Sequence, residues 1–348
     1  MKKNNYVICG VAGRSGGHIL PCLTFMQQSI KDANIEKNTV LFFTTTHTLD
    51  TSLIQQFPHT IKTVQLNLEN IPFKKPWLLP FFGIRAIKSF FTSLYYLYHY
   101  QPHKIISTGG YIAIPVFLAA KLLRIPLLIF ELNVQPGKAT SWLAPYCSKV
   151  HTCFQETQQF LPTVPCTSTM YPIRFTQENK LKTIPKHLIE RGFNKKKKTI
   201  FITGGSQGSQ NINRAFSHSA TNLADTDLQI IHQTGNLQDI SMLEEIYKNC
   251  NFNYYLFDFE KDMAPYYALA DLIICRSGAG TLFEIEFFEK PCITIPLETK
   301  NNNHQVANAK AFAEKKPQLF KIISQEKIFS EPNILVTYIE SLLYQPKV

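Results

Sequence analysis

The sequence contains no uninterrupted apolar run of 18 residues, the length at which a segment becomes a candidate membrane-spanning helix. Its richest apolar stretch, residues 111–132, is broken by two prolines, a lysine and an arginine. Only four apolar residues lie between the polar start of the chain and Gly10, too few for the core of a signal peptide. We therefore expect a cytoplasmic protein with no segment across a membrane.

Cysteine pairs of the C-x-x-C type are absent, although the chain has eight cysteines. Several of them, such as Cys9 and Cys275, lie inside apolar runs. This pattern argues against a zinc site or a disulfide framework and predicts reduced cysteines in the core. The pair Asp225 and Asp227 looks like the metal-holding D-x-D of some nucleotide-sugar enzymes, but it stands in a polar loop, where aspartates usually form turns. We therefore predict no metal site.

Acidic residues are scarce relative to basic ones, with 25 Asp and Glu against 36 Lys and Arg, which gives a net charge of +11. Such an excess predicts an anionic partner: a nucleic acid, a phosphorylated small molecule or an acidic membrane surface. No zinc finger, RNP or helix-turn-helix pattern is visible, so we predict no nucleic-acid binding. A phosphorylated ligand and an acidic membrane surface remain as candidates.

The chain alternates short apolar runs with helical stretches. Residues 6–9 and 40–43 are such runs, and after a proline-bearing stretch the plan begins again at 199–203. Continuously apolar strands separated by helices indicate parallel sheets covered on both faces. The length is about twice that of a typical domain. We predict an α/β protein with two Rossmann-like, doubly wound parallel-sheet domains that face each other across a cleft.

The domain boundary is placed in the proline-bearing linker. We predict a first domain at 1–172 and a second at 173–332. The helix expected within 333–348 is a candidate to pack back on the first domain.

A glycine-rich loop at residues 13–18 follows the first apolar strand and opens a helix. Glycines let a ligand approach the backbone, and the helix N-terminus offers N–H groups to an anion. His18 falls near the first helical turn, where positive partial charge disfavours a protonated imidazole and suits a general base. An equally good interpretation is that His18 only caps this turn.

The second half has two similar loops. Residues 204–208 follow its first strand, and residues 274–281 precede a helix that carries Glu284. A carboxylate there is suited to accept both ribose hydroxyls while the loop N–H groups face a diphosphate. The alternative is a capping box in which Glu284 serves its own helix. Two phosphate-type loops in one half favour a nucleotide diphosphate as ligand.

A stretch rich in prolines, large apolar residues and basic residues begins at Ile71. Its mixed composition is typical of a patch that docks on an anionic bilayer. Further along, Ile87, Phe91, Leu94 and Tyr98 recur at helical spacing and are candidates for the core. For the first part of the stretch, the alternative to a membrane patch is a loop packed on its own domain. The predicted patch consists of Phe73, Lys74, Lys75, Trp77, Leu78, Leu79, Phe81, Phe82 and Arg85.

Together these loops give the chain a resemblance to the MurG family, UDP-N-acetylglucosamine transferases that convert lipid I to lipid II in peptidoglycan synthesis. The resemblance rests on motifs in family order, which are G-G-T-G-G-H-x-x-P at 13–21, G-G-Y-x-x-x-P at 109–115, E-Q-N at 131–133, G-N-P-V-R at 170–174, G-G-S-Q-G at 204–208, H-Q-T/S-G at 232–235, C-R-S-G-A-x-T-x-x-E at 275–284 and D-H-Q-x-x-N-A at 303–309. The chain departs from them at Arg14, Leu132, Met170-Tyr171 and Asn303. Arg14 brings charge and bulk to the acceptor side, either to hold a diphosphate or to narrow the site.

The resemblance implies a GT-B fold, with a membrane-facing acceptor domain first and a donor domain second. It implies His18 or Glu131 as the catalytic base, and Gly13, Arg14, Gly109, Gly110 and Tyr111 on the acceptor side. The implied UDP-N-acetylglucosamine site consists of Ser15, Gly16, Gly17, Asn133, Arg174, Ser206, Ala279, Gly280, Thr281, Glu284, His304 and Gln305.

The implied reaction is an inverting transfer of N-acetylglucosamine to the 4-hydroxyl of the muramyl sugar of lipid I, without a metal or other cofactor. The expected location is the cytoplasmic face of the plasma membrane, where the protein binds peripherally and could meet other cell-wall or division proteins. Two alternatives stay open. One is a GT-B glycosyltransferase that acts on another membrane lipid, and the other is a weakly active UDP-sugar-binding scaffold of the wall-building machinery.

Overall fold

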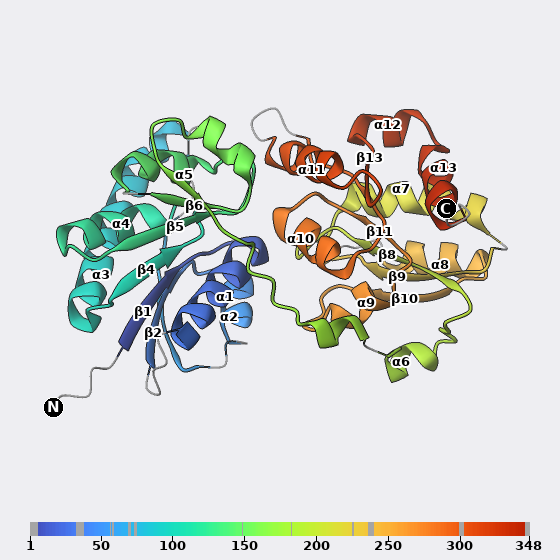
Figure 1. The fold of residues 1–348 in the computed structure, drawn as a ribbon, viewed down its shortest axis with the longest axis horizontal. Helices are drawn as coiled ribbons and strands as arrows, with labels where there is room; N and C mark the ends of the chain where they lie inside the picture. The colour runs from blue at the N-terminus through green and yellow to red at the C-terminus, as the bar shows by residue number, and fades with distance from the viewer. Residues whose placement is uncertain are drawn as a thin grey trace. The chain divides into compact units, whose positions relative to one another are not determined.

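The structure is a computed structural model of the chain, in which two compact units, Met1–Arg174 and Phe175–Val348, are distinguished. Each unit has its own parallel sheet with helices on both faces (Figure 1). The described residues are 6–32, 38–55, 57, 59–68, 71–72, 75–147, 149–181, 183–224, 226–235, 240–298 and 303–344.

The first unit is built on a sheet with the strand order β3-β2-β1-β4-β5-β6-β7, in which every neighbouring pair is parallel. Its strands are β1 (Tyr6–Val11), β2 (Asn38–Thr44), β3 (Ile61–Gln65), β4 (Lys104–Ser107), β5 (Leu127–Glu131), β6 (Val150–Thr152) and β7 (Cys166–Ser168). Its helices are α1 (Gly16–Asp32), α2 (Thr48–Ile54), α3 (Leu79–Tyr100), α4 (Ala113–Leu122) and α5 (Lys138–Leu143), with 3-10 turns η1 (Pro76–Leu78), η2 (Ala144–Tyr146) and η3 (Gln155–Phe160).

Alternate residues of these strands feed two cores, one on each face of the sheet. Cys9 and Val11 of β1 face the core that α3, α4 and α5 cover. Ile8 of the same strand faces the core that α1 and α2 cover. Because successive side chains of a strand point to opposite faces, a strand buried on both sides must be apolar throughout. This is the pattern from which the sequence predicted a doubly wound sheet.

The second unit has the strand order β10-β9-β8-β11-β12-β13, again parallel throughout. Its strands are β8 (Lys198–Thr203), β9 (Leu228–Gln233), β10 (Asn253–Phe257), β11 (Leu272–Cys275), β12 (Cys292–Thr294) and β13 (Phe320–Ile322). Its helices are α6 (Lys186–Ile189), α7 (Gln210–Ala220), α8 (Ile240–Asn249), α9 (Ala264–Leu269), α10 (Ala279–Phe288), α11 (His304–Lys315), α12 (Gln325–Ser330) and α13 (Ile334–Leu343), with 3-10 turns η4 (Gln177–Leu181) and η5 (Thr221–Leu223).

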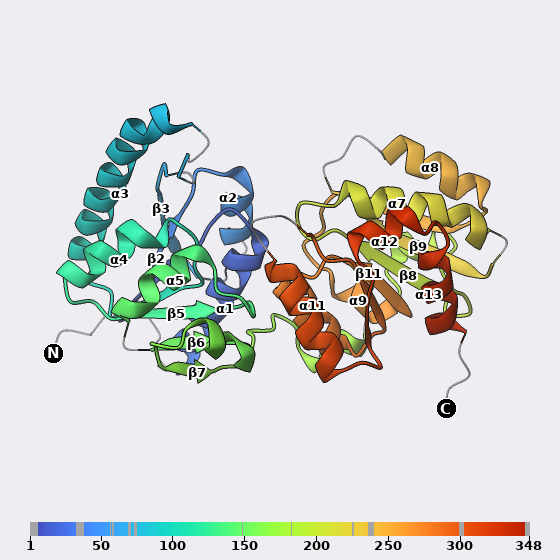
Figure 2. The same ribbon diagram turned by 90° about the horizontal axis from the view of Figure 1, so that it is seen from above.

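The C-terminal helix belongs to the second unit, which corrects the expectation that it packs on the first. Leu335, Val336, Ile339 and Leu343 of α13 are buried in the core that α7 and α8 also cover. Figure 2 shows α13 among the elements of the second unit. These positions form one apolar face of the helix, and the face finds its partners in α7 and β11. The unit itself begins at Phe175, whose ring packs against Tyr267, Phe287 and Phe288.

In each sheet, the chain order of the strands reverses at one point. In the first sheet β1 lies between β2 and β4, and in the second β8 lies between β9 and β11. In open parallel sheets, ligands bind just outside the carboxyl ends of the strands at this switch point. The loops that follow β1 and β4, and those that follow β8 and β11, are therefore where the fold favours a site.

Candidate active site

His18 stands at the switch point of the first sheet, in the first turn of α1. Its Nδ1 atom lies 2.8 Å from the carbonyl oxygen of Thr108, just after β4, and the Thr108 hydroxyl donates to the His18 carbonyl at 2.8 Å. A carbonyl only accepts hydrogen bonds, so Nδ1 must carry the proton of the neutral ring. Nε2 then keeps its lone pair. The structure thus gives His18 the tautomer that a general base needs, anchored by β4 rather than by its own turn.

Glu131, at the end of β5, has a different role in the structure. The side chain is buried, and Oε1 accepts hydrogen bonds from the backbone N–H groups of Leu132 and Asn133 and from Asn133 Nδ2, at 3.0–3.1 Å. Oε2 accepts from the Gly137 N–H at 3.0 Å. Both oxygens are thus used to shape the loop between β5 and α5. This geometry suits a residue that positions the loop better than one that takes a proton from substrate.

The other residues predicted for the acceptor side lie in the loops that follow β1 and β4, at the same switch point. Gly109 and Gly110 follow β4 with φ of +93° and +89°, a backbone region that favours glycine. A Cβ on Gly110 would meet open space, whereas one on Gly109 would lie 4.0 Å from the His18 ring. The exposed Arg14 places its guanidinium carbon 5.8 Å from the centre of the Tyr111 ring, a cation–π contact.

Five residues predicted for the donor lie in the first unit, namely Ser15, Gly16, Gly17, Asn133 and Arg174. Gly16 is buried and Gly17 is exposed at the start of α1, and the Ser15 carbonyl accepts from the His18 N–H at 3.1 Å. Asn133 supports Glu131 through its side-chain amide. Ser15, Gly16 and Gly17 thus directly precede His18 in the chain, whereas Asn133 belongs to the loop between β5 and α5. The rest of the predicted donor set lies in the second unit.

In the second unit, the Gly204–Gly208 loop follows β8 and interlocks with the loop that follows β9. A Cβ on Gly208 would lie 2.5 Å from the Thr234 carbonyl oxygen, and one on Gly235 would lie 2.5 Å from Gly208 Cα. Both glycines have positive φ. Ser206, at the tip of the loop, is exposed. The glycines therefore serve a close backbone contact that presents Ser206 at the carboxyl edge of the sheet.

The loop after β11 leads into α10, whose N-cap is Gly278. A capping box pairs the N-cap residue with the third helical residue, and the side chain of each bonds the backbone N–H of the other. Here Thr281 is the third residue of the helix and Glu284 the sixth, so the two cannot form a capping box. The first turn has no acidic residue, and by helix geometry the N–H groups of Ala279, Gly280 and Thr281 have no carbonyl partner within the helix. This end of α10 is suited to an anion, with the half-buried Glu284 one turn further along.

The sequence analysis assigned no role to Arg276, but in the structure its side chain connects several of the segments at the carboxyl edge of the second sheet. It is buried, and its Nε donates to Ser209 Oγ at 3.0 Å. Its Nη1 donates to the carbonyls of Ile295 and Pro296, at 3.0 and 3.1 Å, and its Nη2 donates to Gln325 Oε1 at 2.9 Å. Burial lowers the pKa of this guanidinium. Glu298 partly opposes this effect. Because the hydrogen-bond partners themselves are all neutral oxygens, Arg276 still brings positive charge to the loops around it.

The remaining predicted donor residues are Arg174, His304 and Gln305. Arg174 is the last residue of the first unit and precedes Phe175, which is anchored in the second. His304 and Gln305 open α11, and Gln305 Oε1 accepts a hydrogen bond from the Leu297 N–H at 2.9 Å. This bond fixes the orientation of the Gln305 amide, so its NH₂ group is the part left to donate to a ligand.

Phe259 is a second residue that sequence reasoning missed. It follows β10 at the same edge, and its side chain is 37% exposed. The Gln233 side chain donates to the Asp258 carbonyl at 3.3 Å and accepts from the Thr203 hydroxyl at 2.6 Å, which connects this segment to the base of the Gly204–Gly208 loop. Its signal in the sequence is an aromatic residue placed just after a strand, among acidic residues.

The eight cysteines are all free, and five of them are buried. The other three, Cys147, Cys153 and Cys166, are only partly buried, so the predicted core position holds for five of the eight. Within the part of the chain that the structure describes, no group of three or more His, Cys, Asp or Glu side chains is arranged to hold a metal ion. Asp225 lies outside the described residues. Asp227 stands just before β9, and its carbonyl accepts from the Lys198 N–H at 3.0 Å.

Large apolar side chains are exposed along η1 and α3. Trp77 and Phe81 are 66% and 64% exposed, and Leu78, Leu79, Lys75 and Arg85 are exposed as well. Phe82 is only half-buried and packs on the core, while Phe73 and Lys74 lie outside the described residues. None of the described helices combines the length and the apolar character that crossing a membrane requires.

The core interpretation of the later part of α3 is wrong for three of its four residues. Ile87, Phe91 and Tyr98 are 60–68% exposed, whereas Leu94 packs against the core. The helix instead buries Ser89, Ser93 and Leu97, because small side chains allow α3 to approach α4 closely. The exposed surface continues onto the neighbouring α4, α5 and η2, through Leu118, Leu122, Trp142 and Tyr146. We call this surface the α3–α5 face.

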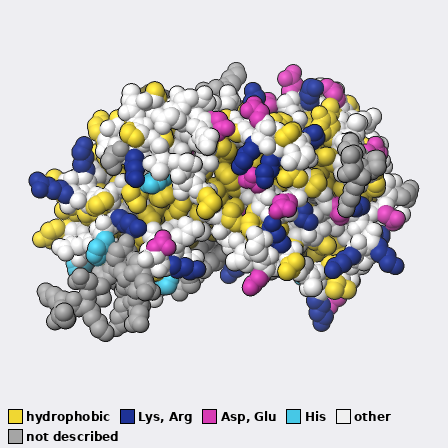
Figure 3. All heavy atoms as spheres, in the orientation of Figure 1, with side chains coloured by type: hydrophobic (Ala, Val, Ile, Leu, Met, Phe, Trp, Pro, Cys, Tyr) yellow, Lys and Arg dark blue, Asp and Glu magenta, His cyan; other side chains and the backbone are white. Residues whose placement is uncertain are grey.

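Charge is distributed unevenly between the units. Residues 1–174 hold 16 Lys and Arg against 6 Asp and Glu, and residues 175–348 hold 20 against 19. Figure 3 shows the same contrast on one side of the molecule, with few acidic side chains over the first unit. Nearly the whole net charge of +11 thus belongs to the unit that carries the α3–α5 face.

Two family models match the chain. The glycosyltransferase family 28 N-terminal domain matches residues 8–152, and the C-terminal domain of that family matches residues 199–346. Two similar proteins are named UDP-N-acetylglucosamine–N-acetylmuramyl-(pentapeptide) pyrophosphoryl-undecaprenol N-acetylglucosamine transferase. The one from Protochlamydia amoebophila is 31% identical, over 95% of this chain and 86% of its own length. The one from Bacillus subtilis is 30% identical, over 87% of this chain and 82% of its own length.

Solved structures agree with this assignment. MurG from Acinetobacter baumannii is similar with a TM-score of 0.70 and 26% identity, over 97% of this chain and 90% of that one. A UDP-glucosyltransferase from Polygonum tinctorium reaches a TM-score of 0.71 at 13% identity, over 99% of this chain and 90% of that one, which shows a shared GT-B fold. The predicted fold class is confirmed. The chain is a glycosyltransferase that belongs to glycosyltransferase family 28 and, within it, to the MurG family.

Proposed function

We propose that this protein transfers N-acetylglucosamine from UDP-N-acetylglucosamine to the 4-hydroxyl of the muramyl sugar of lipid I, with inversion, giving lipid II and UDP. The proposal rests on the observation that the two switch points carry different chemical groups. The first offers an imidazole with an oriented lone pair, and the second offers an anion-binding helix end beside a carboxylate. The names of the full-length relatives supply the identity of the two substrates.

The proposed base is His18. Its Nε2 takes the proton of the acceptor hydroxyl while that oxygen bonds to the anomeric carbon of the donor from the face opposite UDP. The bond between this carbon and the β-phosphate oxygen breaks, and its electron pair leaves with UDP. Glu131 acts by shaping the loop between β5 and α5, since both its oxygens already accept backbone hydrogen bonds.

The proposed donor site stabilises the charge that grows on UDP. The N-terminus of α10 and Ser206 face the diphosphate, with Arg174 and the buried Arg276 adding positive charge. Glu284 accepts the ribose hydroxyls, and Phe259 offers a ring on which the uracil base can stack. The Gln305 NH₂ group and His304 face the sugar hydroxyls. Because dipoles and arginines carry the charge, we propose that the transfer needs no metal.

The proposed location is the cytoplasmic face of the plasma membrane, with the first unit bound peripherally. The α3–α5 face combines exposed Trp, Tyr, Phe and Leu side chains with Lys75, Arg85, Lys88 and Lys121, a composition typical of interfacial surfaces. An excess of positive charge in the same unit favours anionic lipid headgroups. Such binding would bring the His18 switch point to a lipid-linked acceptor.

The test is transfer of labelled N-acetylglucosamine to a lipid I analogue in anionic vesicles, with EDTA present. We expect lipid-linked disaccharide from the wild type and a loss of about 10²–10⁴-fold in kcat for His18→Ala. His218→Ala, which changes an exposed histidine on α7, is the matched control and should retain full activity. Transfer to another lipid but not to lipid I would contradict the proposed acceptor, and UDP binding without any transfer would favour the scaffold.

A further inference from the structure

Asp50, on α2, is a fully buried carboxylate placed directly against the first glycine-rich loop. Its Oδ1 and Oδ2 accept from the backbone N–H of Arg14 at 3.0 and 3.1 Å. Oδ2 also accepts from the Thr44 hydroxyl at 2.9 Å and from the N–H and hydroxyl of Thr45. A Cβ on Gly13 would lie 3.0 Å from Oδ2, so the loop backbone is in close contact with the carboxylate. Charged hydrogen bonds of this kind are strong ones.

Arg14 itself adopts φ of +70°, a left-handed conformation that non-glycine residues rarely take. The conformation costs an arginine more than a glycine, because the Cβ crowds the following carbonyl. Strain of this kind persists when its surroundings hold it, and it often marks a functional site. Here the holding group is identifiable, since the strained residue is the one whose N–H both oxygens of Asp50 bind.

The consequence of this conformation is the direction of the Arg14 side chain. With φ at +70°, Arg14 is exposed, and its guanidinium carbon lies 5.8 Å from the centre of the Tyr111 ring. Two residues further on, α1 begins, with His18 in its first turn. Only three residues separate Arg14, whose N–H binds Asp50, from His18. A change at Asp50 should therefore affect both the position of the guanidinium and the start of α1.

We propose that Asp50 is a positioning residue for the acceptor. It holds Arg14 in the left-handed conformation, so that the guanidinium over Tyr111 binds the diphosphate of the lipid-linked substrate. This inference rests on the proposed function, because it assigns the diphosphate to the acceptor of that reaction. It gives Asp50 no contact with substrate, so its effect must pass through Arg14.

The test compares Asp50→Asn, Arg14→Gly and the double variant in the transfer assay, with acceptor and donor varied in turn. Asparagine keeps the shape but lacks the charge and the second acceptor, so Asp50→Asn should raise KM for the acceptor about tenfold and change KM for UDP-N-acetylglucosamine by less than twofold. Arg14→Gly should also raise KM for the acceptor. Glycine takes a positive φ without help, so adding Asp50→Asn to Arg14→Gly should change KM by less than about twofold.

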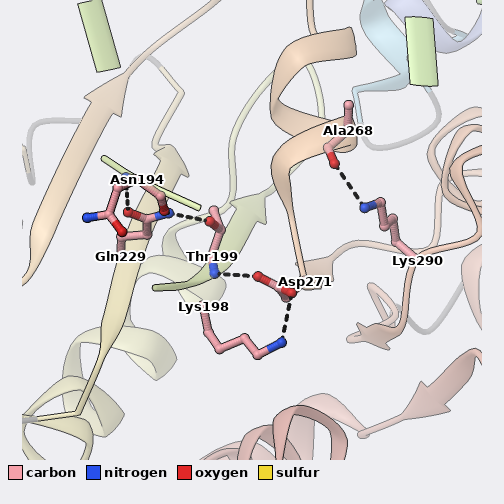
Figure 4. Close-up of polar contacts among 7 residues, drawn as sticks. All are labelled: Asn194, Lys198, Thr199, Gln229, Ala268, Asp271 and Lys290. Carbon is pink, nitrogen blue, oxygen red and sulfur yellow. Dashed lines mark hydrogen bonds and ion pairs between the residues drawn. The ribbon is translucent and has the colours of Figure 1, made fainter. Parts of the chain in front are cut away.

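The matched control is Asp271→Asn in the second unit. Asp271 likewise accepts a backbone N–H, that of Thr199 at 2.9 Å, and it pairs with Lys198 at 3.1 Å, at the amino end of its sheet (Figure 4). This variant should lower Tm without moving either KM. The proposal is wrong if Asp50→Asn costs the same factor in both Arg14 backgrounds, or if it changes the KM values of donor and acceptor equally.

Binding of a short prenyl diphosphate, titrated without donor, separates this proposal from the proposed reaction. If the wild type binds the compound and Asp50→Asn binds it about tenfold more weakly, Asp50 positions a diphosphate subsite even where no disaccharide forms. Failure of transfer with that result would count against the reaction only. Equal Kd values for the wild type and Asp50→Asn, or no binding by the wild type, would overturn the role of Asp50.

Discussion

Lowering the pH from 7 to 5 should destabilise the second unit through His232. This residue of β9 is completely buried, and its ring bridges two neighbours: Nδ1 lies 2.7 Å from the Tyr247 hydroxyl, and Nε2 lies 3.0 Å from Asn213 Oδ1. Asn213 Nδ2 donates to the Thr234 carbonyl, so its oxygen must face the ring. The arrangement satisfies a neutral imidazole with its proton on Nε2 and offers a second proton no acceptor other than a hydroxyl.

The size of the effect follows from the pKa difference between the folded and unfolded states. Burial lowers the pKa of His232 from 6.5 to about 3. Below pH 6.5 the unfolded chain therefore binds a proton that the folded chain does not, so stability falls as the pH falls, down to about pH 3. Between pH 7 and pH 5 this difference amounts to about 2 kcal/mol of unfolding free energy.

Urea unfolding at pH 7 and pH 5 measures this loss. Far-UV circular dichroism follows the whole chain, and fluorescence of Trp77 and Trp142 follows the first unit separately. His232→Gln keeps a hydrogen-bonding side chain that does not titrate, so the wild type should lose about 2 kcal/mol more than this variant. The exposed His218, changed to Gln, is the control and should behave as the wild type. Equal losses in the wild type and His232→Gln would refute the reasoning.

Three further predictions follow from the same geometry. Gly208→Ala should cost about 2–5 kcal/mol of unfolding free energy, because the new Cβ would clash with the Thr234 carbonyl and φ is positive. At Gly205 the new Cβ would meet open space, so Gly205→Ala should cost only about 1–2 kcal/mol, which is due to the positive φ. Urea unfolding of the two variants measures the difference. Glu284→Gln should raise KM for UDP-N-acetylglucosamine about tenfold, whereas Glu286→Gln, which loses ion pairs with Lys315 and Lys316, should leave it unchanged in the transfer assay. Trp77→Glu or Phe91→Glu should weaken binding to anionic vesicles about tenfold, measured by co-sedimentation. Phe329→Glu also removes an exposed aromatic side chain, but from the second unit, and should leave vesicle binding unchanged.

Much of the fold could be predicted because its signals are local. Strands buried on both faces are continuously apolar, so β1, β2 and β8 were visible as short runs in the sequence. The shorter edge strands β7 and β13 lack that signal, since each has three residues and neighbours only one strand. The face of α3 was misassigned in part because helical periodicity identifies an apolar stripe but not whether the stripe is covered. The buried face of α3 is instead the one that carries Ser89 and Ser93, because these small side chains allow close contact with α4.

The candidate site was predictable to the extent that it follows from backbone loops. Glycines mark loops 13–17 and 204–208 whatever surrounds them. The tautomer of His18 depends on the Thr108 carbonyl, and the role of Glu131 on N–H groups up to six residues ahead. Arg276 has partners from three other loops or helices, none of them adjacent in sequence. Contacts of this kind have no periodic signature, so only the folded chain reveals them.

The two switch points use one architecture for opposite tasks, and this has a consequence for enzymology. At the first, a backbone carbonyl orients the imidazole of His18, the proposed base, and the buried carboxylates Asp50 and Glu131 accept backbone N–H groups. At the second, a helix end without acidic residues and a buried arginine among neutral oxygens supply positive potential. The hydrogen-bond partners described for each set lie within its own unit. Substitutions at Asp50 should therefore change KM for the acceptor, and those at Glu284 should change KM for UDP-N-acetylglucosamine. A single variant that changed both KM values would show that the two sites are coupled.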